Sequence, residues 1–153
     1  MDVRAYRDDD EHAVVALWDT CFPDRRTWNQ PREIIRRKRA VQPDLLLVGT
    51  LGARVVATVV VGWDGHRGWL YHLAVASDCR RRGFGVQMVR EAESRLRALG
   101  CPKVNLQIHA ANREVVAFYA RGGNANEHLD PRLKKLELSA DDQKALVEFL
   151  SSL

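Results

Sequence analysis

The sequence has few of the features that mark a membrane, secreted or metal-binding protein. No apolar run approaches the roughly 20 residues that a membrane-spanning helix needs, and the longest is residues 55–62. The first ten residues, MDVRAYRDDD, include no apolar segment of the kind found in secretory signals. The three cysteines form no CxxC pair, which favours neither a disulfide framework nor a zinc site. We therefore expect a cytoplasmic protein that binds no metal and no membrane.

The composition is that of one globular domain. The chain has 153 residues, of which 46% are apolar and 29% charged, so it can bury one core but has little room for two. We therefore predict a single domain over residues 1–153. The net charge of +4 is mild. The basic run at residues 32–39 spreads its charges around a predicted helix without interleaved aromatic residues, so we expect a solvated face and no nucleic-acid binding.

The hydrophobic pattern predicts a mixed α/β (α+β) fold. The expected order is a strand, two helices, three strands, a helix, a strand and a helix. The strands are expected at residues 3–6, 44–50, 55–63, 69–75 and 103–108, and the helices at about residues 9–21, 28–40, 84–99 and 112–123. Short glycine-containing turns join the three central strands into an antiparallel meander. The helix at residues 84–99, with Val86, Val89, Glu93 and Leu96 along its apolar stripe, leads to a parallel strand.

An arginine- and glycine-rich turn, DCRRRGFGVQMV, joins a predicted strand to that helix at residues 78–89. Gly83 and Gly85 permit backbone N–H groups to converge at the positive end of a helix dipole, where anions bind. Arginines 80, 81 and 82 add positive charge, which predicts a ligand with several phosphates. The third glycine of a dinucleotide-binding fingerprint is missing, and no Lys-Ser/Thr pair follows as in a Walker A loop. The alternative is a solvated basic turn whose glycines only reverse the chain.

The motif Arg80-x-x-Gly83-x-Gly85 after the strand YHLAV resembles the acetyl-CoA pyrophosphate loop of the GCN5-related N-acetyltransferases, or GNAT family. The resemblance covers about residues 1–121, and RTWNQP, DGHRGWLYHLAV and GCPKV are most similar to the YpeA-like bacterial subgroup. It implies a mostly antiparallel central sheet flanked by helices. It also implies direct transfer of an acetyl group from acetyl-CoA to a primary amine of a small molecule or a protein.

The resemblance assigns a cofactor role to two segments and one isolated residue. Backbone N–H groups from Arg81 to Val86 would hold the pyrophosphate, and the strand before the turn would pair with the pantetheine arm. That strand and the one at residues 103–108 would splay apart to admit the thioester. The implied cofactor-binding residues are Leu73, Ala74, Val75, Arg80, Arg81, Arg82, Gly83, Phe84, Gly85, Val86 and Asn112.

Two residues are candidates for the proton transfers. Tyr119 lies where the family often has a tyrosine that protonates the leaving thiolate. His72, on the strand beside the expected thioester, is a candidate base for the amine, although it could equally be a hydrogen-bonded histidine of the sheet. The loop CFPDRRTWNQP would border the acceptor site, where Trp28, Arg25 and Arg26 could contact the substrate. The alternative is that Trp28 packs on the core and the two arginines are solvated.

The resemblance ends near residue 122. The tail at residues 122–153 is instead similar to the C-terminal end of dihaem cytochrome c peroxidases, but the chain has no CxxCH motif, so we expect no haem. The sequence pattern of the tail predicts an atypical helix with one apolar face. That face could cover the sheet edge, cover the acceptor groove or pair with a second copy in a homodimer. An alternative function is therefore a CoA-binding module with lost or weak catalysis.

Overall fold

The computed structural model describes residues 1–22 and 26–106. Their centre is a five-stranded sheet with strand order β1-β2-β3-β4-β5. The strands are β1 (Asp2–Ala5), β2 (Leu46–Leu51), β3 (Arg54–Trp63), β4 (Gly68–Val75) and β5 (Val104–Leu106), and the helices are α1 (Glu11–Cys21), α2 (Pro31–Val41) and α3 (Phe84–Ala98). Neighbouring strands are antiparallel except β4 and β5, which are parallel. The predicted mixed fold and element order are therefore confirmed as far as residue 106.

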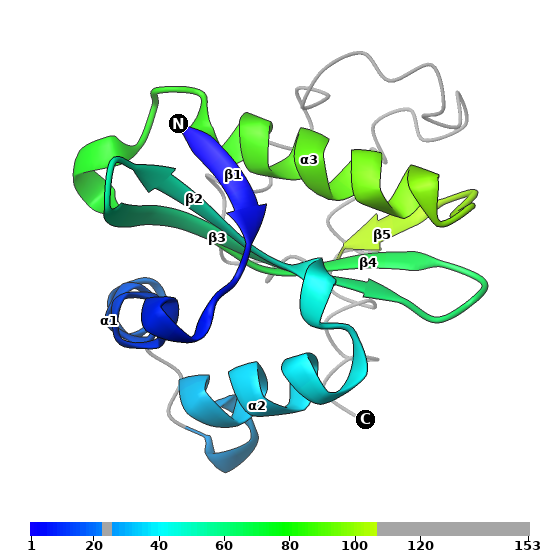
Figure 1. The fold of residues 1–153 in the computed structure, drawn as a ribbon, viewed down its shortest axis with the longest axis horizontal. Helices are drawn as coiled ribbons and strands as arrows, with labels where there is room; N and C mark the ends of the chain where they lie inside the picture. The colour runs from blue at the N-terminus through cyan, green and yellow to red at the C-terminus, as the bar shows by residue number, and fades with distance from the viewer. Residues whose placement is uncertain (23–25, 107–153) are drawn as a thin grey trace, which may run out of the picture. The chain divides into compact units, whose positions relative to one another are not determined.

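Helix α3 covers one face of the sheet, and α1 and α2 cover the other (Figure 1). On the α3 side, Met88, Ala92 and Leu96 are fully buried against strand residues such as Val59 and Leu47. Of the apolar stripe predicted for this helix, Leu96 is buried and Val89 packs partly buried against the same cluster, whereas Val86 and Glu93 do not belong to it. The fully buried positions instead follow a spacing of four from Met88. Among the described residues, no helix is both long and apolar enough to cross a bilayer.

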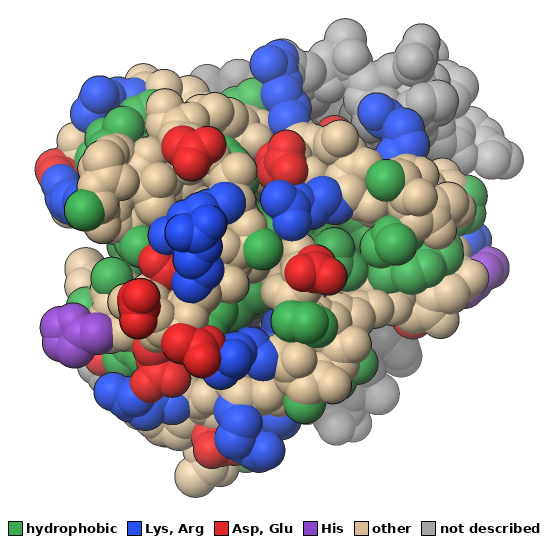
Figure 2. Space-filling view, viewed as in Figure 1, with side chains coloured by type: hydrophobic (Ala, Val, Ile, Leu, Met, Phe, Trp, Pro, Cys, Tyr) green, Lys and Arg blue, Asp and Glu red, His purple; other side chains and the backbone are tan. Residues whose placement is uncertain are grey.

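Helices α1 and α2 are held together and to the sheet by apolar contacts and by ion pairs at the rim. Trp18 of α1 and Ile35 of α2 are buried in one cluster with Leu46 and Val48 of β2. Three arginines of this region pair with carboxylates: Arg4 with Asp10, Arg32 with Glu11 and Arg39 with Asp8. Acidic and basic side chains are accordingly interspersed over much of the face shown in Figure 2. That face therefore presents no continuous basic surface.

Strand β4 carries a β-bulge. Thr58 of β3 pairs with Ala74 and Val60 pairs with Tyr71, so a step of two residues in β3 faces a step of three in β4. His72, at the bulge, adopts a left-handed backbone conformation with φ 47°. The Thr58 hydroxyl donates a hydrogen bond to the His72 carbonyl at 3.4 Å and accepts one from Trp18 Nε1 at 2.7 Å. The bulge therefore has an internal hydrogen-bonded support, and it brings two successive side chains, Tyr71 and His72, to the same cavity.

Candidate active site

The arginine- and glycine-rich turn lies between a short 3-10 turn, Ser77–Cys79, and the first residue of α3, Phe84. Arg81 and Gly83 both adopt positive φ angles, 59° and 79°. A Cβ atom added at Gly83 would meet nothing within 4 Å, so the space beside the helix N-terminus is open. Successive backbone N–H groups in such a turn form a concave anion site, to which the helix dipole adds positive potential. The turn therefore has the backbone shape that a phosphate-bearing ligand requires.

Side chains of this turn also make structural contacts. Arg80 Nε donates a hydrogen bond to the Val75 carbonyl at 3.2 Å and thereby links the turn to the end of β4. The thiol of Cys21 in α1 donates to the same carbonyl at 3.8 Å. The Arg82 guanidinium lies 4.9 Å from the ring centroid of Phe84. The predicted segment from Arg80 to Val86 thus consists of a turn, anchored to β4 through Arg80, and the first residues of α3.

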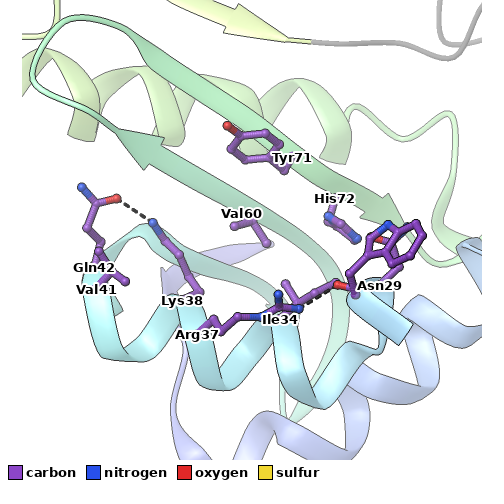
Figure 3. A pocket seen from close by; sticks show the side chains of 10 residues that line it. Asn29, Ile34, Arg37, Lys38, Val41, Gln42, Val60, Tyr71 and His72 are labelled. Atoms are coloured by element: carbon purple, nitrogen blue, oxygen red, sulfur yellow. Dashed lines mark hydrogen bonds between the residues drawn. The ribbon is translucent and has the colours of Figure 1, made fainter. Parts of the chain in front are cut away.

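A cavity of about 390 Å³ lies between α2 and the bulged part of the sheet. Figure 3 shows its walls: side chains of α2 form one side, and those of β3 and β4 form the other. The lining residues are Trp28, Asn29, Ile34, Arg37, Lys38, Val41, Gln42, Val60, Tyr71 and His72. The volume is in the range of small-molecule binding sites in proteins.

His72 lies in this cavity in largely apolar surroundings. Its ring centroid is 5.0 Å from that of Trp18 and 4.9 Å from that of Phe22. Burial lowers the pKa of His72 below its ordinary value of 6.5, because the charged imidazolium loses hydration there. The side chain is therefore neutral at pH 7 and can accept a proton, as the candidate-base assignment requires.

Lys38 was expected on a solvated face, and that expectation was wrong. It follows Ile34 by one helical turn, and its side chain is half-buried at the cavity wall. Burial lowers its pKa from 10.5 to about 8. The ammonium donates to Gln42 Oε1 at 2.7 Å, and Gln42 Nε2 in turn donates to the Trp63 carbonyl at 2.6 Å. The sequence signal that could have identified Lys38 is its spacing of four from Ile34, which places it on the apolar side of a basic helix.

Trp28 is also at the cavity and not in the core. Its side chain is 58% exposed, so the core-packing alternative was wrong. Arg37 Nη2 donates to the Trp28 carbonyl at 2.7 Å, which ties the turn before α2 to the helix. The Arg26 guanidinium lies 5.7 Å from the Trp28 ring centroid. Arg25 lies outside the described residues.

The remaining predicted site residues are only partly within the described region. Leu73, Ala74 and Val75 follow the bulge on β4, between the cavity and the arginine–glycine turn. The β4–β5 pairing runs from Gly68–Val104 to Leu70–Leu106, so the predicted splay beyond it lies outside the described residues. Asn112, Tyr119 and the tail at residues 122–153 lie outside them as well. Their roles stay predictions.

Comparison with known proteins agrees with this geometry. Residues 7–123 match the model of the acetyltransferase (GNAT) family. An acetyltransferase of Sodalis glossinidius is 40% identical over 121 residues, which cover 79% of this chain and 84% of that protein.

Two solved structures share the fold at lower identity. One is the aminoglycoside 6'-N-acetyltransferase of Acinetobacter haemolyticus, with a TM-score of 0.68 and 16% identity over 82% of this chain and 92% of that one. The other is a NatC complex bound to a Gag peptide and CoA, with a TM-score of 0.66 and 17% identity over 77% of this chain and 80% of that one. From the family match over most of its length and the identity to the Sodalis protein, the chain belongs to the GNAT family and is an acetyltransferase.

Proposed function

We propose that the protein is an acetyl-CoA-dependent N-acetyltransferase that acts directly on a primary amine. The observation that carries the proposal is the open left-handed turn at Gly83, which lies at the N-terminus of α3 and directly after the bulged strand β4. A phosphate site at one end of β4 and a neutral histidine in a cavity at its middle fit a long cosubstrate with a pyrophosphate and a reactive thioester. Acetyl-CoA has this form.

The residues present fit this cosubstrate. The N–H groups from Arg81 to Val86 and the charge of the three arginines would hold its pyrophosphate. The backbone of Leu73, Ala74 and Val75 would pair with the amide groups of its pantetheine arm, as an added strand does. Acetyl-CoA supplies the activated acetyl group. The chain has to bind the two substrates, orient them and transfer the protons.

His72 would act on the amine side of the reaction. A protonated alkylamine has a pKa near that of lysine, about 10, so it must lose a proton before it can attack. The neutral His72 ring would accept that proton directly or through one water. Tyr119 would return a proton to the thiolate that leaves, as the family resemblance implies.

A matched pair of glycine variants tests the cosubstrate site. Gly83 and Gly100 flank α3, share a φ of 79° and each have no atom within 4 Å of an added Cβ. Alanine therefore introduces similar backbone strain at both positions, but only Gly83→Ala places a methyl group in the proposed phosphate site. We expect Gly83→Ala to weaken acetyl-CoA binding at least tenfold and Gly100→Ala to leave it unchanged.

Thermal unfolding with acetyl-CoA, CoA or ATP provides the measurement. A ligand at 100 times its dissociation constant stabilises the native state by about 2.7 kcal/mol. We expect the wild type to be stabilised by acetyl-CoA and CoA more than by ATP. Absence of any shift with acetyl-CoA, or equal weakening in the two glycine variants, would contradict the site. Binding without acetyl transfer to any amine would instead favour the CoA-binding module.

A further inference from the structure

The cavity between α2 and β4 has a charge pattern that differs from the rest of α2. Among the described residues, three cations of this helix pair with carboxylates: Arg32 with Glu11, Arg36 with Glu33 and Arg39 with Asp8. The other two, Arg37 and Lys38, line the cavity, and no carboxylate belongs to its described lining. The cavity wall is therefore positively charged where the outer surface of the helix is balanced.

The hydrogen bonds that the two cavity cations make with the described chain go to neutral groups. Lys38 Nζ donates to the amide oxygen of Gln42. Arg37 donates to the backbone carbonyls of Trp28 and Glu33. An ammonium that is half-buried beside a neutral acceptor gains more from a carboxylate than an exposed one, because a charge-assisted hydrogen bond is strongest where water is excluded.

Two carboxylates act electrostatically on lining residues, Glu33 on Arg37 and Asp64 on Tyr71, but their hydrogen bonds are made elsewhere. Glu33 accepts from the Arg36 guanidinium outside the cavity. Asp64, in the turn between β3 and β4, accepts the N–H groups of His66 and Arg67 at 2.8 and 2.6 Å. It also accepts Trp69 Nε1 at 3.1 Å. These bonds hold the pKa of Asp64 at about 2, and they direct its oxygens to its own turn. Asp64 therefore leaves the charge of Lys38 available to a ligand.

The same cavity gathers exposed apolar side chains. Four large apolar residues of the described chain are exposed, and three of them, Trp28, Val41 and Tyr71, line this cavity. Such clustering marks a ligand site, because exposed apolar groups are otherwise scattered singly. Tyr71 reaches the cavity together with His72 because the bulge brings both side chains to it. Figure 3 shows Tyr71 and His72 on β4, across from Lys38 on α2.

We propose that the acceptor is a small amine that also carries a carboxylate and an apolar or aromatic group, as an aromatic amino acid does. Lys38, with Arg37 beside it, would hold the carboxylate, and Trp28 and Tyr71 would contact the apolar group. The amine would then lie toward His72, the proposed base. A polycationic acceptor such as an aminoglycoside would be repelled by the same wall. This inference rests on the proposed acetyl-CoA-dependent function.

Matched amines with and without the carboxylate test the assignment. The pairs are tryptophan with tryptamine and phenylalanine with phenethylamine, with kanamycin as a polycation, and release of free CoA measures turnover. We expect a kcat/KM at least tenfold higher for the carboxylated member of each pair and no turnover of kanamycin. Lys38→Met, which keeps the length of the side chain, should remove this preference by raising KM for the amino acids alone.

The matched control is Arg36→Met on the same helix, since Arg36 is exposed and pairs with Glu33 outside the cavity. It should leave the preference unchanged. Thermal stabilisation by acetyl-CoA is measured in parallel for each variant. If acetyl-CoA does not stabilise the wild type, the proposed cosubstrate site is contradicted. If acetyl-CoA stabilises the wild type but the carboxylated amines react no better than their partners, or neither reacts, the acceptor assignment is overturned.

Discussion

The two faces of the central sheet are built differently. Between α3 and the sheet, contact is made by apolar groups such as Met88, Ala92 and Leu96, all fully buried. On the α1–α2 face, a buried indole and a buried hydroxyl, those of Trp18 and Thr58, form a polar link to the backbone of β4. A cavity whose described lining carries positive charge and no carboxylate lies beside that link.

This difference indicates a division of roles. The α3 face stabilises the sheet and holds the start of α3, with the arginine–glycine turn before it, against β4. The α1–α2 face leaves a cavity beside His72, and hydrogen bonds there support the bulge. In a close-packed apolar interface, a cavity left by a smaller side chain lowers stability. A hydrogen-bonded bulge instead determines the direction of individual side chains. Mutations on the two faces should therefore affect different properties.

The largest effect on stability is expected on the α3 face. Leu96→Ala removes a fully buried side chain and should lower the free energy of unfolding by about 2–5 kcal/mol. Acetyl-CoA affinity at temperatures where the variant is folded should be unchanged, because Leu96 lies at the far end of α3 from Gly83. Urea unfolding monitored by circular dichroism measures the loss. The control is Leu99→Ala, at a half-exposed position, and an equal loss in the two variants would show that the face is not close-packed.

An intermediate effect is expected at the polar link on the other face. Thr58→Val preserves shape but removes the acceptor for Trp18 Nε1 and the donor for the His72 carbonyl. The buried unpaired groups should cost about 1–3 kcal/mol of unfolding free energy. Because the bulge loses its support, kcat should also fall, whereas acetyl-CoA affinity should change little.

Thr58→Ser keeps the hydroxyl and separates the two explanations for such a result. It should restore most of kcat even if the lost methyl group lowers stability. Steady-state kinetics with a reactive amine and urea unfolding are measured on both variants. If Thr58→Val retains full kcat, the hydrogen bonds do not position His72.

The smallest effect concerns pH. Burial lowers the pKa of His72 in the native state relative to the unfolded chain, so the unfolded state binds the proton more readily. The contribution of neutral His72 to the free energy of unfolding is therefore fully present above pH 6.5, and it is lost as the pH falls through the lowered pKa of the native state. His72→Gln should lose less stability between pH 7 and pH 5 than the wild type. Unfolding free energies across this range measure the difference, and parallel curves would show that His72 is not desolvated.

Much of the framework could be predicted from local sequence patterns. The Pro31 start of α2, the β-branched residues of β3 and the Gly83 start of α3 each reflect preferences of a few neighbouring residues. The arginine–glycine turn was recognised for the same reason, since its spacing is contained within six residues. The cavity beside His72 was predicted only in part. Trp28 was a candidate for the acceptor site, but Lys38 and Tyr71 were not, because they come from two other elements of the chain.

By itself, the sequence determined the order of the elements, the mixed sheet and the arginine–glycine turn, because periodicity, turn residues and backbone freedom act over short distances. Only the tertiary structure decided which side chains meet at the proposed acceptor site. The bulge in β4 depends on its register with β3 and on a hydrogen bond between Trp18 and Thr58, which are 40 residues apart. Lys38 acquires its lowered pKa only because folding places α2 against the sheet and removes water from its ammonium.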